Sequence, residues 1–176
     1  IVMLGRTEKL VMANTVMNNN TRTGMPSESF YSAITLENDA RLNHCTIIHN
    51  NAPGICAVNG SLRLYNSVLW GNTSTGTIAP EDVQITGAAT MLDIRNNAIQ
   101  NAPEEWNLWS ENMQLSVVQG DPLYPAFVNP TRNVGAVSSG YDTPLGGPAR
   151  FEPTCESPLV IAGDESIVDD PDLVLD

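Results

Sequence analysis

Apolar residues along this chain fall in short runs that are rich in β-branched side chains and are interrupted by Gly, Asn and Pro. Asparagine is unusually frequent, with 18 residues. Asn and Thr are poor helix formers, and no run repeats with the 3.6-residue period of an amphipathic helix. The pattern therefore predicts many short β-strands and an all-β chain.

One short pattern recurs four times in the first part of the chain. Its copies are residues 12–19, 43–50, 64–71 and 94–101. The third residues of the copies, taken as equivalent, are Asn14, Cys45, Asn66 and Asn96. The resulting periods of 31, 21 and 30 residues lie in the range of solenoid repeats.

Alternate positions of the copies form columns, as expected if stacked coils face a common interior. Two of these columns are Leu10, Leu62 and Leu92, and Met12, Leu64 and Ile94. A third column, also predicted to face inward, is Val16, Ile47, Val68 and Ala98. The equivalent asparagines predict a ladder of side-chain amides that Cys45 interrupts. Leu42 is displaced from its column by one residue, which predicts a local bulge.

These columns predict a right-handed parallel β-helix, a solenoid, over residues 1–102. An antiparallel β-sandwich is the alternative, but it does not predict the recurring Asn-Thr/Ser-Val signature. The repeat fades after Asn101, so residues 103–176 are predicted to form an irregular, acidic segment that caps the last coil. The chain starts at Ile1 inside an apolar pattern, which predicts that it is a piece of a longer parent chain.

The charge balance excludes one class of partner. Twenty acidic residues against eight basic ones give a net charge of −12, which repels the phosphates of nucleic acids. No stretch approaches the roughly 20 consecutive apolar residues of a membrane-spanning helix, so no membrane insertion is predicted for this segment.

The three cysteines, Cys45, Cys56 and Cys155, lack the spacing of a zinc site. One disulfide with a free thiol and three unpaired thiols are both compatible with the sequence. The acidic end offers oxygen ligands of the kind calcium prefers, at Asp164, Glu165, Asp169 and Asp170. It lacks the spacing of an EF-hand loop, so no cofactor is predicted and calcium is the one candidate ion.

Several segments resemble, in order, motifs of a family of secreted bacterial proteins. Residues 64–72, Leu-Tyr-Asn-Ser-Val-Leu-Trp-Gly-Asn, resemble its coil L-x-N-S-I-x-W-G-N. Residues 120–123 with 127–130 resemble its x-D-P-L-F-V segment, and residues 157–164 resemble its closing S-P-A-I-D-A-G-D. The chain is thus similar to right-handed β-helix proteins of Bacteroidetes with a choice-of-anchor Q domain. It departs from them at Tyr124-Pro125-Ala126, which is inserted, and at Ile161, which replaces an acidic residue.

The resemblance implies export and a place outside the cell or at the outer cell surface, with an anchor or sorting signal beyond this segment. It implies no catalytic residues, because the family is defined by its scaffold. A glycan or a surface protein is the partner that we expect.

Candidate catalytic residues are sparse. Arg63 and Arg95 lie inside the repeats, where neighbouring coils would bring them close together, as a polysaccharide lyase requires of its cations and base. Asp93 is the carboxylate in the coils best placed for a glycoside hydrolase, which needs two carboxylates at a set separation.

Aromatic residues provide candidate stacking platforms for sugar rings, at Tyr65, Trp70, Trp106 and Trp109. The favoured hypothesis is a non-catalytic surface module for adhesion, glycan binding or spacing. The alternative is a polysaccharide lyase or glycoside hydrolase with its site on the face of the β-helix.

Overall fold

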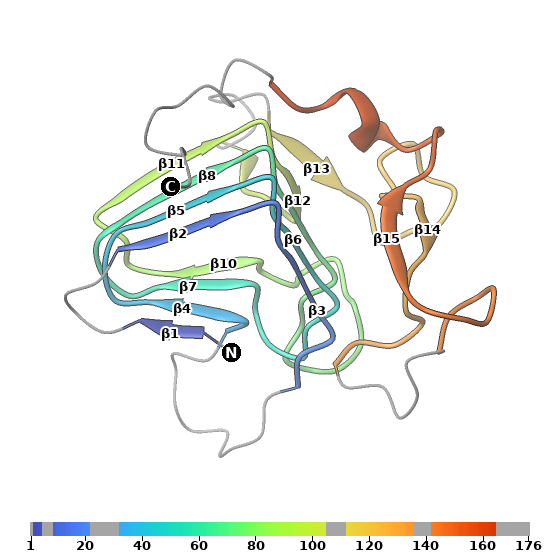
Figure 1. The fold of residues 1–176 in the computed structure, drawn as a ribbon, viewed down its shortest axis with the longest axis horizontal. Coiled ribbons are helices and arrows are strands. Elements are labelled where there is room, and N and C mark those ends of the chain that lie inside the picture. Colours follow the sequence, from blue (N-terminus) through green and yellow to red (C-terminus); the bar gives the residue numbers. More distant parts are fainter. Residues whose placement is uncertain (1, 5–8, 22–31, 105–111, 136–141, 165–176) are drawn as a thin grey trace.

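Each coil of the chain contributes one strand to each of three parallel sheets, which enclose a common core (Figure 1). The computed structural model describes residues 2–4, 9–21, 32–104, 112–135 and 142–164. The first sheet contains β1 (Val2–Leu4), β4 (Ile34–Leu36), β7 (Ile55–Ala57) and β10 (Ile85–Gly87). The predicted all-β parallel β-helix is confirmed.

The second and third sheets follow the same coil order. The second contains β2 (Leu10–Ala13), β5 (Ala40–Asn43), β8 (Ser61–Tyr65) and β11 (Met91–Arg95). The third contains β3 (Val16–Asn18), β6 (Thr46–Ile48), β9 (Val68–Trp70), β12 (Ala98–Gln100) and β13 (Met113–Leu115). All strand pairs within these three sheets are parallel, so each coil stacks on the one before it.

The second coil is in strict register with its neighbours, so the predicted bulge is wrong. Leu42 pairs with both Met12 and Leu64, and therefore belongs to the inward column from which the sequence alignment displaced it. His44, not Cys45, takes the corner position shared by Asn14, Asn66 and Asn96. All four have left-handed backbone, with φ between 48° and 53°, a conformation that is enriched in Asn and His.

The third sheet turns the opposite set of side chains inward from the set predicted. Val16 pairs with Thr46, and Thr46 pairs with Val68, so this column points outward, and Val16 is 55% exposed. The inward column is one residue later. It consists of Met17, Ile47, Leu69 and Ile99, which pack in the main core. Of the four predicted residues, Ile47 alone faces inward.

The longest amide ladder stabilises the corner that follows the third sheet. Asn20 Nδ2 donates to Asn50 Oδ1 at 2.8 Å, and Asn50 Nδ2 donates to Asn72 Oδ1 at 2.7 Å. Asn72 Nδ2 then donates to Gln84 Oε1 at 2.8 Å. Each acceptor oxygen also receives the backbone N–H of the preceding ladder residue. Buried amides are tolerated here because every coil supplies a partner for the next. The corner predicted for a ladder, between the second and third sheets, has an amide pair one residue later than predicted, in which Asn97 Nδ2 donates to Asn112 Oδ1 at 3.1 Å.

The C-terminal segment lies along the outer side of the third sheet (Figure 1). It contains the antiparallel pair β14 (Phe127–Asn129) and β15 (Arg150–Pro153) and a 3₁₀ helix, Pro158–Ile161. Its apolar side chains form a second core with the outward residues of the sheet. The buried members are Ile48, Trp70, Ala98, Leu115, Phe127 and Phe151. The segment therefore covers one side of the solenoid rather than only its last coil.

His49 joins this segment to the second coil. Its Nδ1 lies 2.8 Å from Thr131 Oγ1, and its ring contacts Trp70 and Phe151 at centroid distances of 5.0 and 5.8 Å. The Thr131 hydroxyl donates its hydrogen to Asn19 Oδ1, so its oxygen accepts a hydrogen bond from the N–H of His49 Nδ1, which assigns this tautomer. Burial lowers the pKa of His49 to about 4. Gly71 leaves room for the ring, because a Cβ there would lie 2.7 Å from His49 Cδ2.

The inward column of the third sheet can be tested with a matched pair of variants. We expect Leu69→Asp to unfold the protein or to reduce its free energy of unfolding by more than about 4 kcal/mol, because it buries an unpaired charge at a fully buried site. Val16→Asp, on the exposed face of the same sheet, should cost less than about 0.5 kcal/mol. Thermal unfolding followed by circular dichroism measures both. Equal melting temperatures would contradict the assignment.

The ladder predicts that replacing one of its amides lowers the free energy of unfolding. In Asn50→Asp, a carboxylate replaces the donor to Asn72 Oδ1 and Met17 O, so two acceptors face a negative charge. We expect a loss of about 3 kcal/mol in chemical denaturation. Asn59→Asp makes the same chemical change at an exposed residue and should be nearly silent. A similar loss in both variants would mean that the ladder is not the cause.

The buried His49 predicts acid sensitivity. Its folded-state pKa of about 4 lies below the unfolded value of 6.5, so protonation favours the unfolded chain. Its contribution is fully present above pH 6.5 and is lost as the pH falls toward 4, by about 3 kcal/mol in total. Denaturation of His49→Gln across this range should show a shallower pH dependence than the parent. Parallel curves for the two proteins would refute the assignment.

Candidate ligand-binding face

The outward face of the second sheet brings three arginines from successive coils together. Side chains alternate along its strands, so Leu62 and Leu64 enter the core while Arg63 and Tyr65 point outward. Strand register places Arg41, Arg63 and Asp93 in one outward column. Asn43, Tyr65 and Arg95 form the next one.

Asp93 and Tyr65 are the centre of this cluster. Tyr65 Oη donates to Asp93 Oδ2 at 2.6 Å. Arg95 donates to the same carboxylate from Nε and Nη2, at 2.7 and 3.0 Å. The guanidinium carbons of Arg41 and Arg95 each lie 5.9 Å from the centre of the Tyr65 ring, within cation–π range.

The protonation states follow from these contacts. Burial and the hydrogen bond to Asp93 both raise the pKa of Tyr65, so the phenol stays protonated. Burial by itself would raise the pKa of Asp93. The hydrogen bonds from Tyr65 and Arg95 outweigh it, so this pKa lies below its usual value. The ionised Asp93 carboxylate thus already accepts hydrogen bonds from both Tyr65 and Arg95.

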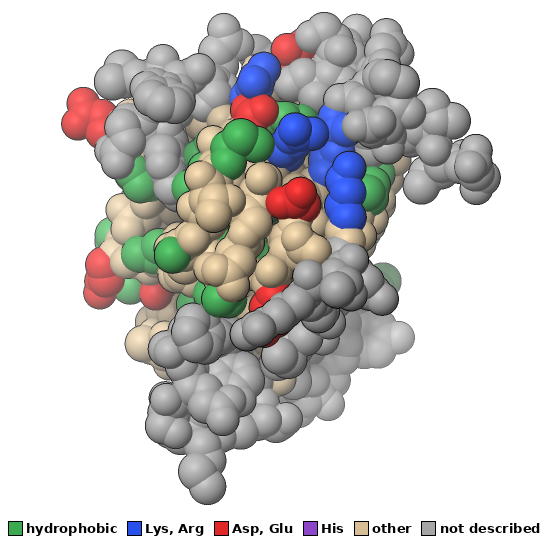
Figure 2. All heavy atoms as spheres, turned by 90° about the vertical axis from the view of Figure 1, so that its left-hand side faces the viewer, with side chains coloured by type: hydrophobic (Ala, Val, Ile, Leu, Met, Phe, Trp, Pro, Cys, Tyr) green, Lys and Arg blue, Asp and Glu red, His purple; other side chains and the backbone are tan. Residues whose placement is uncertain are grey.

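The arginines differ in their access to solvent. The Arg95 side chain is 57% exposed and Arg63 is half-buried, whereas Arg41 is 2% exposed. Figure 2, which views this side of the molecule, shows Lys and Arg side chains gathered in one area with acidic side chains beside them. A ligand would therefore meet Arg63 and Arg95, while Arg41, beside Arg63 in the same column, is buried with its guanidinium near the Tyr65 ring.

The candidate catalytic residues Asp93, Arg63 and Arg95 thus lie together. The sequence predicted nearby positions for Arg63 and Arg95, but it assigned no partner to Asp93. It placed Arg41 in a column of its own, because the one-residue misalignment of the second coil hid the pairing of Arg41 with Arg63. Asp39, the acid that precedes β5, is engaged elsewhere, because its carboxylate accepts the backbone N–H of Ser61 at 2.8 Å.

The aromatic platforms predicted for sugar rings do not form one site. Tyr65 points outward from the second sheet and Trp70 points outward from the third, and both are buried, at 7% and 4% exposed. Tyr124 and Phe127 cover the Trp70 indole, whose Nε1 donates to Ser116 O at 3.1 Å. Trp106 and Trp109 lie outside the described residues.

The remaining candidates can be placed only in part. Of the predicted calcium ligands, Asp164 is described, and Glu165, Asp169 and Asp170 lie outside the described residues. Within the described part of the chain, no three His, Cys, Asp or Glu side chains gather as a metal site would require. The cysteines are unpaired thiols, of which Cys45 and Cys56 are buried. Burial raises the pKa of Cys45.

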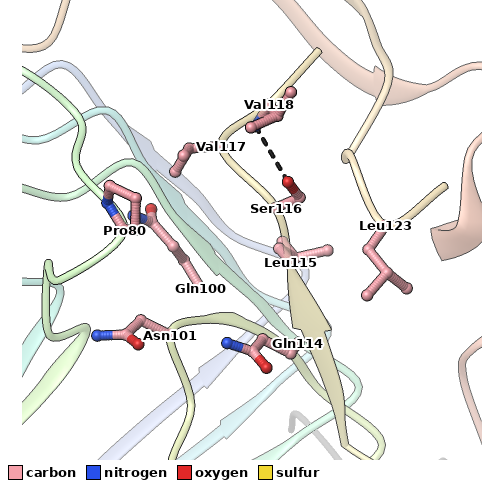
Figure 3. A pocket seen from close by; sticks show the side chains of 9 residues that line it. All are labelled: Pro80, Gln100, Asn101, Gln114, Leu115, Ser116, Val117, Val118 and Leu123. Carbon is pink, nitrogen blue, oxygen red and sulfur yellow. Dashed lines mark hydrogen bonds between the residues drawn. The ribbon is translucent and has the colours of Figure 1, made fainter. Parts of the chain in front are cut away.

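A small cavity of about 230 Å³ lies beside the end of β13, in the third sheet (Figure 3). Its walls combine the amides of Gln100, Asn101 and Gln114 with apolar side chains such as Pro80. Gln100 is buried, and its amide is held by Gly71 N and Ala79 O.

No protein-family model, curated protein or solved structure matches this chain. The structure therefore supports a β-solenoid architecture without assigning a family. No helix in the described residues is long and apolar enough to cross a membrane.

Proposed function

We propose that this chain is a non-catalytic, surface-displayed β-helix module that binds acidic glycans through the outward face of its second sheet. The single observation that supports this is the cluster of Arg63, Arg95 and Tyr65 on one flat face. Three of the eight basic residues in a chain of net charge −12 lie on this face. The proposal places the module outside the cell, where such glycans occur.

The chemistry of the face favours carboxylate or sulfate groups. Guanidinium groups bind such anions through paired hydrogen bonds, and adjacent parallel strands lie about 4.8 Å apart. Arginines on successive coils can therefore contact successive charged groups of an extended polymer. The Nε and Nη2 edge of Arg95 is paired with the Asp93 carboxylate, so a ligand anion would use the remaining N–H donors of this exposed guanidinium.

Binding without catalysis fits the protonation states better than a lyase or a hydrolase does. A lyase needs a base, but the pKa of Tyr65 is raised and its proton is directed to Asp93. The same hydrogen bonds occupy Asp93, which would otherwise be the candidate acid or nucleophile.

The proposal predicts loss of acidic-glycan binding when either exposed arginine is neutralised. Polygalacturonate and heparin are titrated against the protein at low salt by isothermal calorimetry, with dextran as the uncharged polymer. Arg63→Gln and Arg95→Gln should each weaken the binding of the acidic polymer by about tenfold. The affinity should fall with added salt.

Arg150→Gln is the matched control, because it removes the same charge from an exposed residue of β15. If all three variants bound the acidic polymer with equal affinity, the loss of affinity would follow from the change in overall charge. That result would refute the proposed site. Appearance of unsaturated uronate or new reducing ends during the titration would instead favour the enzyme.

A further inference from the structure

A half-open groove of about 790 Å³ separates the third sheet from the C-terminal segment. Its floor is aromatic, with Trp70, Tyr124 and Phe127 as lining residues. The Trp70 ring meets Tyr124 edge-on at 5.6 Å and 84°, and it meets Phe127 at 6.4 Å and 62°. The groove has a volume typical of small-molecule sites and lies on a different sheet from the arginine cluster.

One polar group on the floor is available to a ligand. Tyr124 is half-buried, and its hydroxyl has no hydrogen-bond partner within the described part of the chain. Burial raises the pKa of this phenol, so it remains a neutral group that can donate and accept. A hydroxyl group of a ligand can replace the water that such a solvent-accessible phenol binds.

The rim of the groove is polar but nearly balanced in charge. Arg132, Asp121 and Glu156 line it and are exposed, together with the amide of Gln119. One positive and two negative groups, in a chain of net charge −12, disfavour an anionic ligand. They offer donors and acceptors to hydroxyl groups at the edge of a ligand whose flat face lies on aromatic carbon.

We infer that this groove binds a neutral oligosaccharide, with the apolar face of one sugar ring on Tyr124 and its hydroxyls at the Arg132 and Glu156 rim. Sugars combine an apolar ring face with a polar edge, which is the division found between floor and rim here. The inference does not depend on the proposed function, because it concerns another sheet and an uncharged ligand.

The test uses the full chain and three probes, cellopentaose, maltopentaose and mannopentaose, in calorimetric titrations. We expect at least one probe to bind and Tyr124→Ala to weaken that binding by about tenfold. Tyr124→Phe keeps the ring and loses only the hydroxyl, so it should cost less than the alanine variant. Arg63→Gln, on the other face, should leave binding unchanged.

A second readout guards against an unfolded variant. The resonance of the Trp70 indole N–H is assigned by its absence from the spectrum of Trp70→Phe. In nuclear magnetic resonance spectra of the parent protein, this resonance should shift when the binding probe is added. Failure of all three probes at millimolar concentration with the folded parent would overturn the inference. So would equal affinity in folded Tyr124→Ala and Tyr124→Phe. Either result leaves the acidic-glycan titrations unaffected.

Discussion

The structure depends on the register between successive coils. The first three corners after the third sheet repeat a residue with left-handed backbone followed by a ladder amide, as at His49 and Asn50. Because side chains alternate along a strand, a slip of one residue would exchange the core face for the solvent face. The ladder opposes such a slip, because the slip would separate the buried amides from their hydrogen-bond partners.

The same register allows coils of unequal length. The second and third coils are 21 or 22 residues apart in the paired strands, whereas their neighbours are about 30 apart. The extra residues leave the coil at corners, where they do not disturb the strands. One such loop supplies Gln84, whose longer side chain is the last ladder member and accepts from Asn72.

Stacking also separates the two faces to which we assign the proposed binding sites. The outward side of the third sheet is apolar at Ile48, Trp70 and Leu115, so the C-terminal segment covers it and leaves only a groove. The outward side of the second sheet has arginines in register, and Arg63 and Arg95 stay accessible. A rigid array of parallel strands fixes the spacing of these cations, which suits an extended ligand better than a small substrate.

The sequence by itself determined the parallel solenoid and the inward columns of the second sheet, because Leu62 and Leu64 alternate with polar residues. It also predicted nearby outward positions for Arg63 and Arg95, whereas the contacts of Asp93 with Tyr65 and Arg95 came from the structure. Only the tertiary structure decided which side of the third sheet faces the core, since Val68 and Leu69 are both apolar and either could face inward. The positions of Cys45 and Trp70 followed from that choice. Contacts between distant segments, such as Tyr124 on Trp70, leave no periodic signal in a single sequence.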